Sequence, residues 1–184
     1  MNPLSAEGIS YNLRKWWSGF RLSDKAVPRG AYVGNKLFPV KNFSGLVSDD
    51  EVRRWCAVVT IQLLRDLAPA YGLASNYEVR LVNPDYDAPS TELHDNGGGL
   101  LTDEMFGGHV GTGLNVVNVK KCLNAHPGHA SMTFSHELLE MAHNPDALSG
   151  GKEIGDKYQD VSFGYFINGI YVSNFEMPDG KAFR

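Results

Sequence analysis

The chain has 184 residues and a formal net charge of −4, and this length is sufficient for one domain with a hydrophobic core and an appendage. Its two cysteines, Cys56 and Cys122, exclude a disulfide framework and stand in no metal-binding spacing. The N-terminus lacks the apolar segment of a signal peptide, and no apolar run approaches the roughly 18 residues that span a bilayer. We therefore expect a protein that is made in a reducing cytoplasm and contacts no membrane.

Basic residues are concentrated near the N-terminus. Residues 1–48 hold seven Lys and Arg against two acidic residues, whereas the remainder holds ten against nineteen. The segment 1–47 is also rich in Gly, Pro, Asn and aromatic residues, including Trp16 and Trp17. Because an exposed Trp pair is costly, we predict that residues 1–47 form an extended arm that docks on its own domain, another subunit or a polyanion. A solvated tail is the alternative.

The first helix is predicted to begin after Ser48, which can form a capping box with Glu51. Apolar residues then recur at helical spacing, and Gly72 suits the C-terminal cap. These apolar residues are Val52, Trp55, Cys56, Val59, Leu63 and Leu67. Cys56 is thus expected to be a small core residue. From Tyr77 to Val82, alternation of apolar and charged residues predicts a half-buried strand.

The middle of the chain is predicted to alternate between loops and short elements. Residues 85–113 are dense in Gly and Asp and are interpreted as loops, although they contain His94, Asp95 and His109. Leu114–Val119 is predicted to be a second strand because valines dominate it. A loop should follow Lys120 and Lys121.

A buried helix is then predicted from about Ser131 to His143, and Pro145 ends it. Further on, Asn168-Gly169 stands between apolar runs at 163–167 and 170–175, which is a strong hairpin signal because both turn residues must take positive φ. The elements together predict an α+β domain over residues 48–184, with a small mixed sheet, a central helix and a C-terminal β-hairpin.

The central helix carries the residues with chemistry. Glu140 lies roughly 40° round and roughly 6 Å along the helix from His136, so both side chains can reach one metal ion. This is the geometry of the His-Glu-x-x-His helix of zinc peptidases, in which the second residue is the general base. Here the motif reads His-Glu-x-x-Glu, with Glu137 as the candidate base. The competing interpretation places Glu137 and Glu140 on the solvent face of a surface helix.

The third ligand is less constrained by the sequence. His143 lies roughly 10.5 Å along the helix axis from His136, which is too far for the two to share an ion. We therefore expect His143 to support the ligands from nearby or to form a local hydrogen bond. Glu153 and Asp156 follow a Gly-rich turn that could fold them back onto the helix, or they form an exposed acidic turn. Histidines of the predicted loops could be ligands, general acids or oriented imidazoles, or have none of these roles: His94, His126 and His129.

Several segments resemble a family of zincin-like proteins encoded by phages and bacteria. The resemblance covers residues 50 to 180 and rests on segments 64–72, 94–95, 116–119, 135–145, 153–156 and 171–178. It implies a zincin-like metallopeptidase fold, with His136, Glu140 and one of Glu153 or Asp156 around a metal ion. Glu137 is then the candidate base, and His143, His94 and His129 are candidate supporting residues. The sequence departs from the family at Gly155, where Cys is usual, and at His143, where a small residue is usual.

The residues and the resemblance together predict a metal-dependent hydrolase that cleaves peptide or amide bonds. One imidazole and two carboxylates nearly neutralise a divalent ion, so Mn²⁺, Mg²⁺ and Ca²⁺ are candidates beside Zn²⁺. The alternative is a catalytically inactive virion structural or accessory protein that docks on neighbouring virion subunits through residues 1–47. The expected location is accordingly the host cytoplasm or the virion. Nucleic-acid binding through the arm has no recognisable motif to support it.

Overall fold

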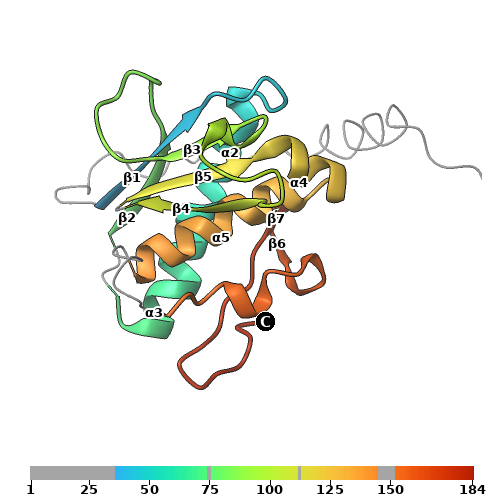
Figure 1. The fold of residues 1–184 in the computed structure, drawn as a ribbon. Coiled ribbons are helices and arrows are strands. Elements are labelled where there is room, and N and C mark those ends of the chain that lie inside the picture. Colours follow the sequence, from blue (N-terminus) through green and yellow to red (C-terminus); the bar gives the residue numbers. More distant parts are fainter. Residues whose placement is uncertain (1–35, 74–75, 112, 145–151) are drawn as a thin grey trace, which may run out of the picture. The chain divides into compact units, whose positions relative to one another are not determined.

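The structure is a computed structural model that describes residues 36–73, 76–111, 113–144 and 152–184 (Figure 1). Most of the predicted arm, residues 1–35, lies outside the described residues. The remainder belongs to a compact unit that extends over Gly34–Arg184. Among the described residues, no helix combines the length and apolar character needed to cross a membrane.

A mixed five-stranded sheet forms the centre of this unit, in the order β2-β1-β3-β5-β4. Its strands are β1 (Lys36–Asn42), β2 (Tyr77–Leu81), β3 (Thr91–His94), β4 (Gly107–Gly111) and β5 (Leu114–Asn118). The first four in spatial order run parallel, and β4 is an antiparallel edge strand beside β5, with His109 opposite Asn115. The predicted α+β class and mixed sheet are therefore confirmed, and the predicted strand after Tyr77 is β2.

Strand β1 corrects the predicted boundary of the arm. Residues Lys36–Asn42 were predicted to lie in the arm, but they form a strand between β2 and β3, with Phe38 and Val40 buried. Pro39 argued against a strand because proline donates no backbone hydrogen bond. Strand β3 pairs with β1 only from Val40 onward, so on that side Pro39 lies outside the ladder. The compact unit thus begins well before Ser48.

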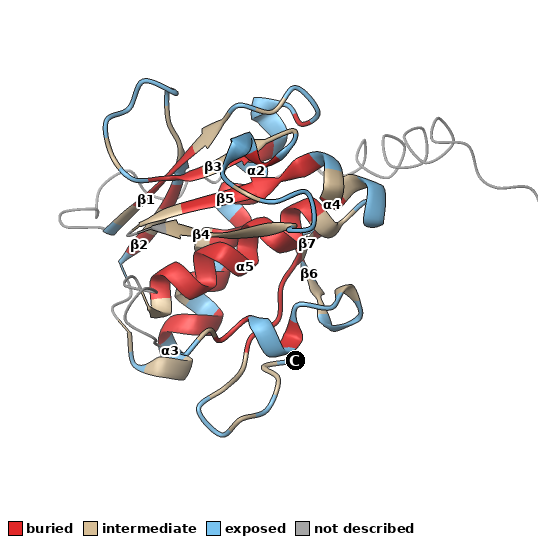
Figure 2. Ribbon diagram, viewed as in Figure 1, coloured by how far each residue is buried: buried red, intermediate tan, exposed pale blue. Residues whose placement is uncertain are grey.

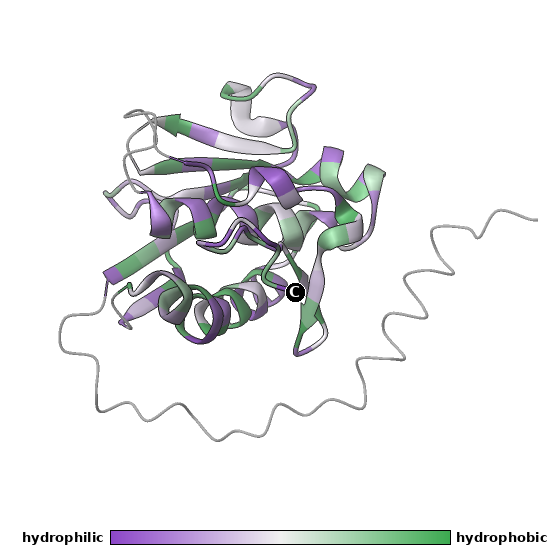
Figure 3. Ribbon diagram, turned by 90° about the horizontal axis from the view of Figure 1, so that it is seen from below, coloured by the Kyte–Doolittle hydropathy of each residue, from purple (hydrophilic) through white to green (hydrophobic). Residues whose placement is uncertain are grey.

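Helix α2 (Asp49–Gln62) begins as predicted, with the Ser48 hydroxyl accepting a hydrogen bond from the Glu51 backbone N–H at 3.2 Å. It continues through a π-helical turn (Leu63–Leu67) into the short helix α3 (Ala68–Tyr71), which ends at Gly72 with φ of 62°. Hydrophobic and hydrophilic residues alternate along the helices in Figure 3. The six apolar residues that were predicted to share one face of this helix are all buried: Val52, Trp55, Cys56, Val59, Leu63 and Leu67.

Helices α4 (Val119–Ala125) and α5 (His129–His143) follow the sheet. The prediction of the central helix is confirmed, although α5 begins two residues earlier than expected. Helix α2 contacts β1, β2 and α5, and α5 contacts β3, β4 and β5, so the two helices cover one face of the sheet. The rings of Trp55 and Phe134 join them, with centroids 5.9 Å apart.

Two loop predictions are wrong in part. Residues 85–113 contain β3, the 3-10 turn Gly97–Gly99 and β4, and the segment after Lys120 is part of α4. Strand β4 begins Gly-Gly-His and therefore shows no alternation of apolar and polar residues. Helix α4 is capped by the Asn118 side chain, which accepts a hydrogen bond from the Lys121 backbone N–H. The closing hairpin is confirmed with shorter strands, β6 (Tyr165–Ile167) and β7 (Ile170–Val172). Its turn residues have φ of 48° and 79°.

Candidate metal centre

Helix α5 is buried along nearly its whole length (Figure 2). His136, Glu137 and Glu140 are exposed by only 8%, 4% and 4%. Taking charged groups out of water is costly unless they are paired, hydrogen-bonded or bound to a metal. The interpretation of Glu137 and Glu140 as solvent-facing charges is therefore wrong, and their burial needs a chemical reason.

The first group of candidate ligands joins α5 to the turn that follows it in the chain. His136 Nε2 lies 3.3 Å from Glu140 Oε2 and 3.6 Å from Asp156 Oδ1. Both distances exceed the usual 2.7–3.2 Å of an N–H···O hydrogen bond. Ligand atoms at about 2.0–2.2 Å from a tetrahedral ion lie about 3.4 Å from one another. These donor atoms consequently fit one divalent cation.

The chain returns to α5 through Gly155. Its N–H donates to Glu140 Oε1 at 3.1 Å, which leaves the other carboxylate oxygen toward His136. A Cβ at position 155 would lie 2.5 Å from His136 Nδ1 and 3.0 Å from Glu140 Oε1. The residue at this position must therefore be glycine for His136 and Glu140 to keep these positions.

Of the two predicted alternatives for the third ligand, Asp156 forms the donor group together with His136 and Glu140. Glu153 lies beside them; burial and the neighbouring Glu140 carboxyl raise the pKa of the Glu153 carboxyl to about 7. Both residues line the same cleft as the helix residues. The Gly-rich turn thus folds both carboxyls back onto α5, as one of the two predictions had it.

Without a metal, protons balance the charge of this group. Burial opposes ionisation of His136, but the neighbouring carboxylates of Asp156 and Glu140 raise the pKa of its imidazole to about 10. The imidazole of His136 in turn lowers the pKa of Asp156. Burial raises the pKa of Glu137 to about 8, although the charge on His136 opposes the shift. A divalent cation would take the place of the His136 proton.

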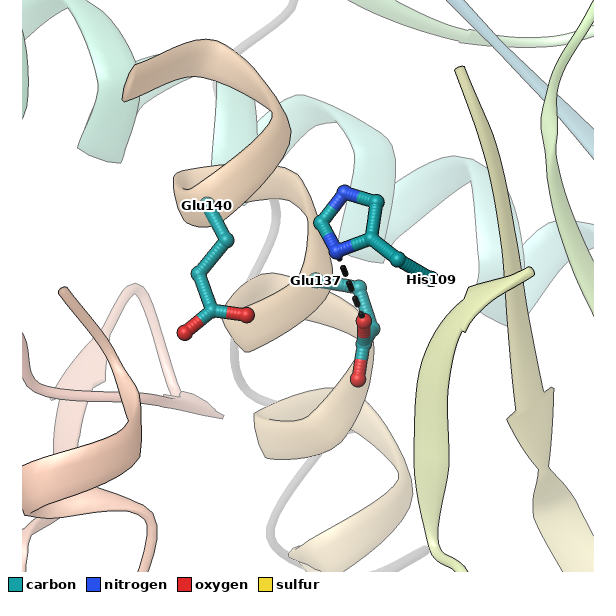
Figure 4. A group of neighbouring side chains, drawn as sticks. All are labelled: His109, Glu137 and Glu140. Carbon is teal, nitrogen blue, oxygen red and sulfur yellow. Dashed lines mark ion pairs between the residues drawn. The ribbon is translucent and has the colours of Figure 1, made fainter. Parts of the chain in front are cut away.

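Strand β4 brings His109 to Glu137, a contact that sequence reasoning missed (Figure 4). His109 Nδ1 lies 3.9 Å from Glu137 Oε2. The approach depends on Gly107, where a Cβ would lie 2.6 Å from Glu137 Oε1 and 2.6 Å from Thr133 Cγ2. The paired glycines at 107 and 108 were the available signal, since glycine in a strand often marks a close approach of another backbone or side chain.

The cluster opens into a cleft of about 800 Å³ between β4, α5 and the segment 153–161. His126 and His129 line this cleft as well, and the His129 ring packs on Phe106 at 4.2 Å between centroids. The other two predicted supporting histidines lie elsewhere. His94 is 3.0 Å from a Glu92 oxygen and stacks on Phe43, and His143 meets Tyr71 edge-on.

Comparisons of the chain with protein-family models, with curated proteins and with solved structures found no match. The chemistry of the site therefore has to be argued from its own residues.

Proposed function

We propose that the protein is a metal-dependent hydrolase of the zincin-like type that cleaves peptide or amide bonds. The observation that carries the proposal is the spacing of His136 Nε2 from the Glu140 and Asp156 oxygens, 3.3 Å and 3.6 Å, beside the buried carboxyl of Glu137. These residues lie in a cleft that has room for a substrate. His136, Glu140 and Asp156 would hold the ion, with Glu153 beside them.

When bound, a divalent cation supplies Lewis acidity toward a carbonyl oxygen and lowers the pKa of a water molecule. Glu137 supplies the base. Its Oε2 atom is buried and has no hydrogen-bond partner among the described residues, so a lone pair is free to accept a proton. Once protonated, the same carboxyl can donate the proton to a leaving amine.

An extended peptide suits the geometry of the cleft. Strand β4 is at the edge of the sheet, and Gly107 and Gly108 line the cleft. The outer edge of such a strand offers backbone N–H and C=O groups that can pair with an extended chain. The donor set of one imidazole with carboxylates suits Mn²⁺ as well as Zn²⁺, so both ions belong in the test.

The test is cleavage of a mixed peptide library by the full chain loaded with Zn²⁺ or Mn²⁺, read by mass spectrometry. Glu137→Gln should lower the cleavage rate by about 10²–10⁴-fold, the usual contribution of a general base. Glu51→Gln is the matched control, because Glu51 is exposed on α2 and Gln also fits a capping box. If the metal-loaded chain cleaves no peptide, the proposal fails and the predicted non-catalytic virion role gains support.

A further inference from the structure

A second group of ligand atoms lies next to the first (Figure 4). It consists of His109 from β4 with Glu137 and Glu140 from α5, whose donor atoms all lie within 4.8 Å of one another. Glu140 belongs to both groups. We propose that His109, Glu137 and Glu140 form a second divalent-cation position, occupied in addition to the one at His136.

A buried and unpartnered carboxylate oxygen aimed at this position is the first argument. Glu137 is 4% exposed, and its Oε2, which faces His109 Nδ1, has no hydrogen-bond partner among the described residues. A buried carboxylate oxygen without a hydrogen-bond donor is costly. The 3.9 Å between Glu137 Oε2 and His109 Nδ1 is too long for a hydrogen bond. Around an octahedral ion with bonds of about 2.1 Å, neighbouring ligand atoms are roughly 3 Å apart and opposite ligand atoms roughly 4.2 Å apart. The distance between Glu137 Oε2 and His109 Nδ1 lies between these two values.

The charge of the cleft is the second argument. Four carboxyl groups gather around the two positions: Glu137, Glu140, Glu153 and Asp156. When all are ionised, one divalent cation leaves two negative charges uncompensated beside the buried Glu137 and Glu140. A second divalent cation balances them. No Lys or Arg is among the cleft-lining residues that the structure describes, so the protein itself does not supply this positive charge.

Glu140 can serve both positions. A carboxylate offers about four lone-pair sites on two oxygens, of which Oε1 accepts the Gly155 N–H and Oε2 faces His136. Carboxylates that bridge two ions about 3.5–4 Å apart are a known arrangement in two-metal hydrolase sites. Sharing one glutamate would link the occupancies, so that loss of Glu140 weakens both positions whereas loss of His109 weakens only the second.

The functional consequence rests on the proposed function, but the binding itself does not. Glu137 is the proposed base, and an ion at the second position occupies the lone pair that accepts the proton. Excess divalent cation should therefore inhibit hydrolysis. His109 does not belong to the first group. Its replacement should therefore remove this inhibition and leave the first ion in place.

The test is titration of the metal-free full chain with Zn²⁺ alone, followed calorimetrically and by elemental analysis. Wild type should bind two ions per chain, His109→Ala and His109→Gln one each, and His94→Ala two. His94 is the matched control because it pairs with Glu92 outside the cleft. The His109 variants should keep the ion of the first group, because His109 does not belong to that group.

The outcomes separate the second position from the first. One ion in wild type with no change in the His109 variants overturns the second position and leaves the first intact. Two ions in the His109 variants overturn it as well, because the second ion then binds elsewhere. No bound zinc in wild type overturns both. As a further readout, excess zinc should slow peptide cleavage by wild type and not by His109→Gln.

Discussion

Replacement of Gly155 by alanine tests the arrangement of the first group most sharply. The added Cβ would lie 2.5 Å from His136 Nδ1, 2.7 Å from its Cε1 and 3.0 Å from Glu140 Oε1. Real Cβ contacts are not found below 3.0 Å, so the imidazole or the chain at 155 has to move. His136 is 8% exposed on a fully packed helix, which leaves it little room.

Two effects of different size follow from this overlap. Forcing an extra carbon into a packed site typically costs about 1–3 kcal/mol of stability. Metal affinity should fall by about 10–100-fold, the usual effect of disturbing residues that orient metal ligands. The 155 N–H that donates to Glu140 would also shift away from its acceptor. The loss of affinity should therefore exceed what the loss of stability alone predicts.

The assay is zinc titration together with urea unfolding of the metal-free protein. Gly45→Ala is the control, because its nearest neighbour would be a terminal oxygen of Asp95 at an ordinary 3.7 Å. We expect the control to match wild type in both measurements. Unchanged zinc affinity and stability in Gly155→Ala would refute the close approach of residue 155 to His136.

Two further predictions concern stability. Ser48→Ala removes the side-chain acceptor of the Glu51 N–H at the start of α2 and should lower the free energy of unfolding in urea by about 1 kcal/mol. Ser162 is exposed on a surface turn, so Ser162→Ala should cost less than half of that. Equal losses in the two variants would argue against the cap. The metal-free protein should lose stability as the pH rises from 6 to 9. The folded-state pKa of His136 is raised to about 10, so its contribution is complete below the unfolded value of 6.5 and declines as the pH rises toward 10. The folded-state pKa of Glu137 is raised to about 8, so its ionisation also destabilises the folded state as the pH rises from 4.5 to 8. Each such group contributes up to about 1.4 kcal/mol per pH unit, and stability that is constant or rises over this range would contradict both shifts.

Elements with local signals could be predicted from the sequence. The start of α2 depends on Ser48 and Glu51, three residues apart, and the end of α3 depends on Gly72, so neighbouring residues determine both. The hairpin turn at Asn168-Gly169 is likewise a local choice, because those two residue types tolerate positive φ. Helix α5 was predictable because apolar residues recur through it and a proline, Pro145, follows in the sequence.

Strands β1, β3 and β4 could not be predicted, since nothing within each segment requires a strand. Strand β3 has four residues, β4 begins with two glycines, and β1 contains Pro39. Each becomes a strand by pairing with partners elsewhere in the chain, as β4 does with β5. Tertiary pairing of this kind outweighs local propensity.

In the candidate site, too, some contacts follow from local sequence and others only from tertiary structure. His136 and Glu140 are four residues apart on one helix, so helical geometry alone brings their side chains together. Asp156 reaches them through a return of the chain that depends on Gly155, which the sequence left open between two outcomes. His109 reaches Glu137 only because β4 forms beside α5, and the sequence does not encode that proximity locally.

The central claim is that His136 and Glu140 hold a divalent metal ion, and metal analysis of the purified full chain tests it most directly. Elemental analysis by mass spectrometry should find bound metal in the wild type after exposure to zinc or manganese, and much less in Glu140→Ala. His136→Ala should lose the ion of the first group. His94→Ala, altered outside the cleft, should retain the wild-type content. Wild type without metal, or His136→Ala and Glu140→Ala with undiminished metal content, would contradict the account.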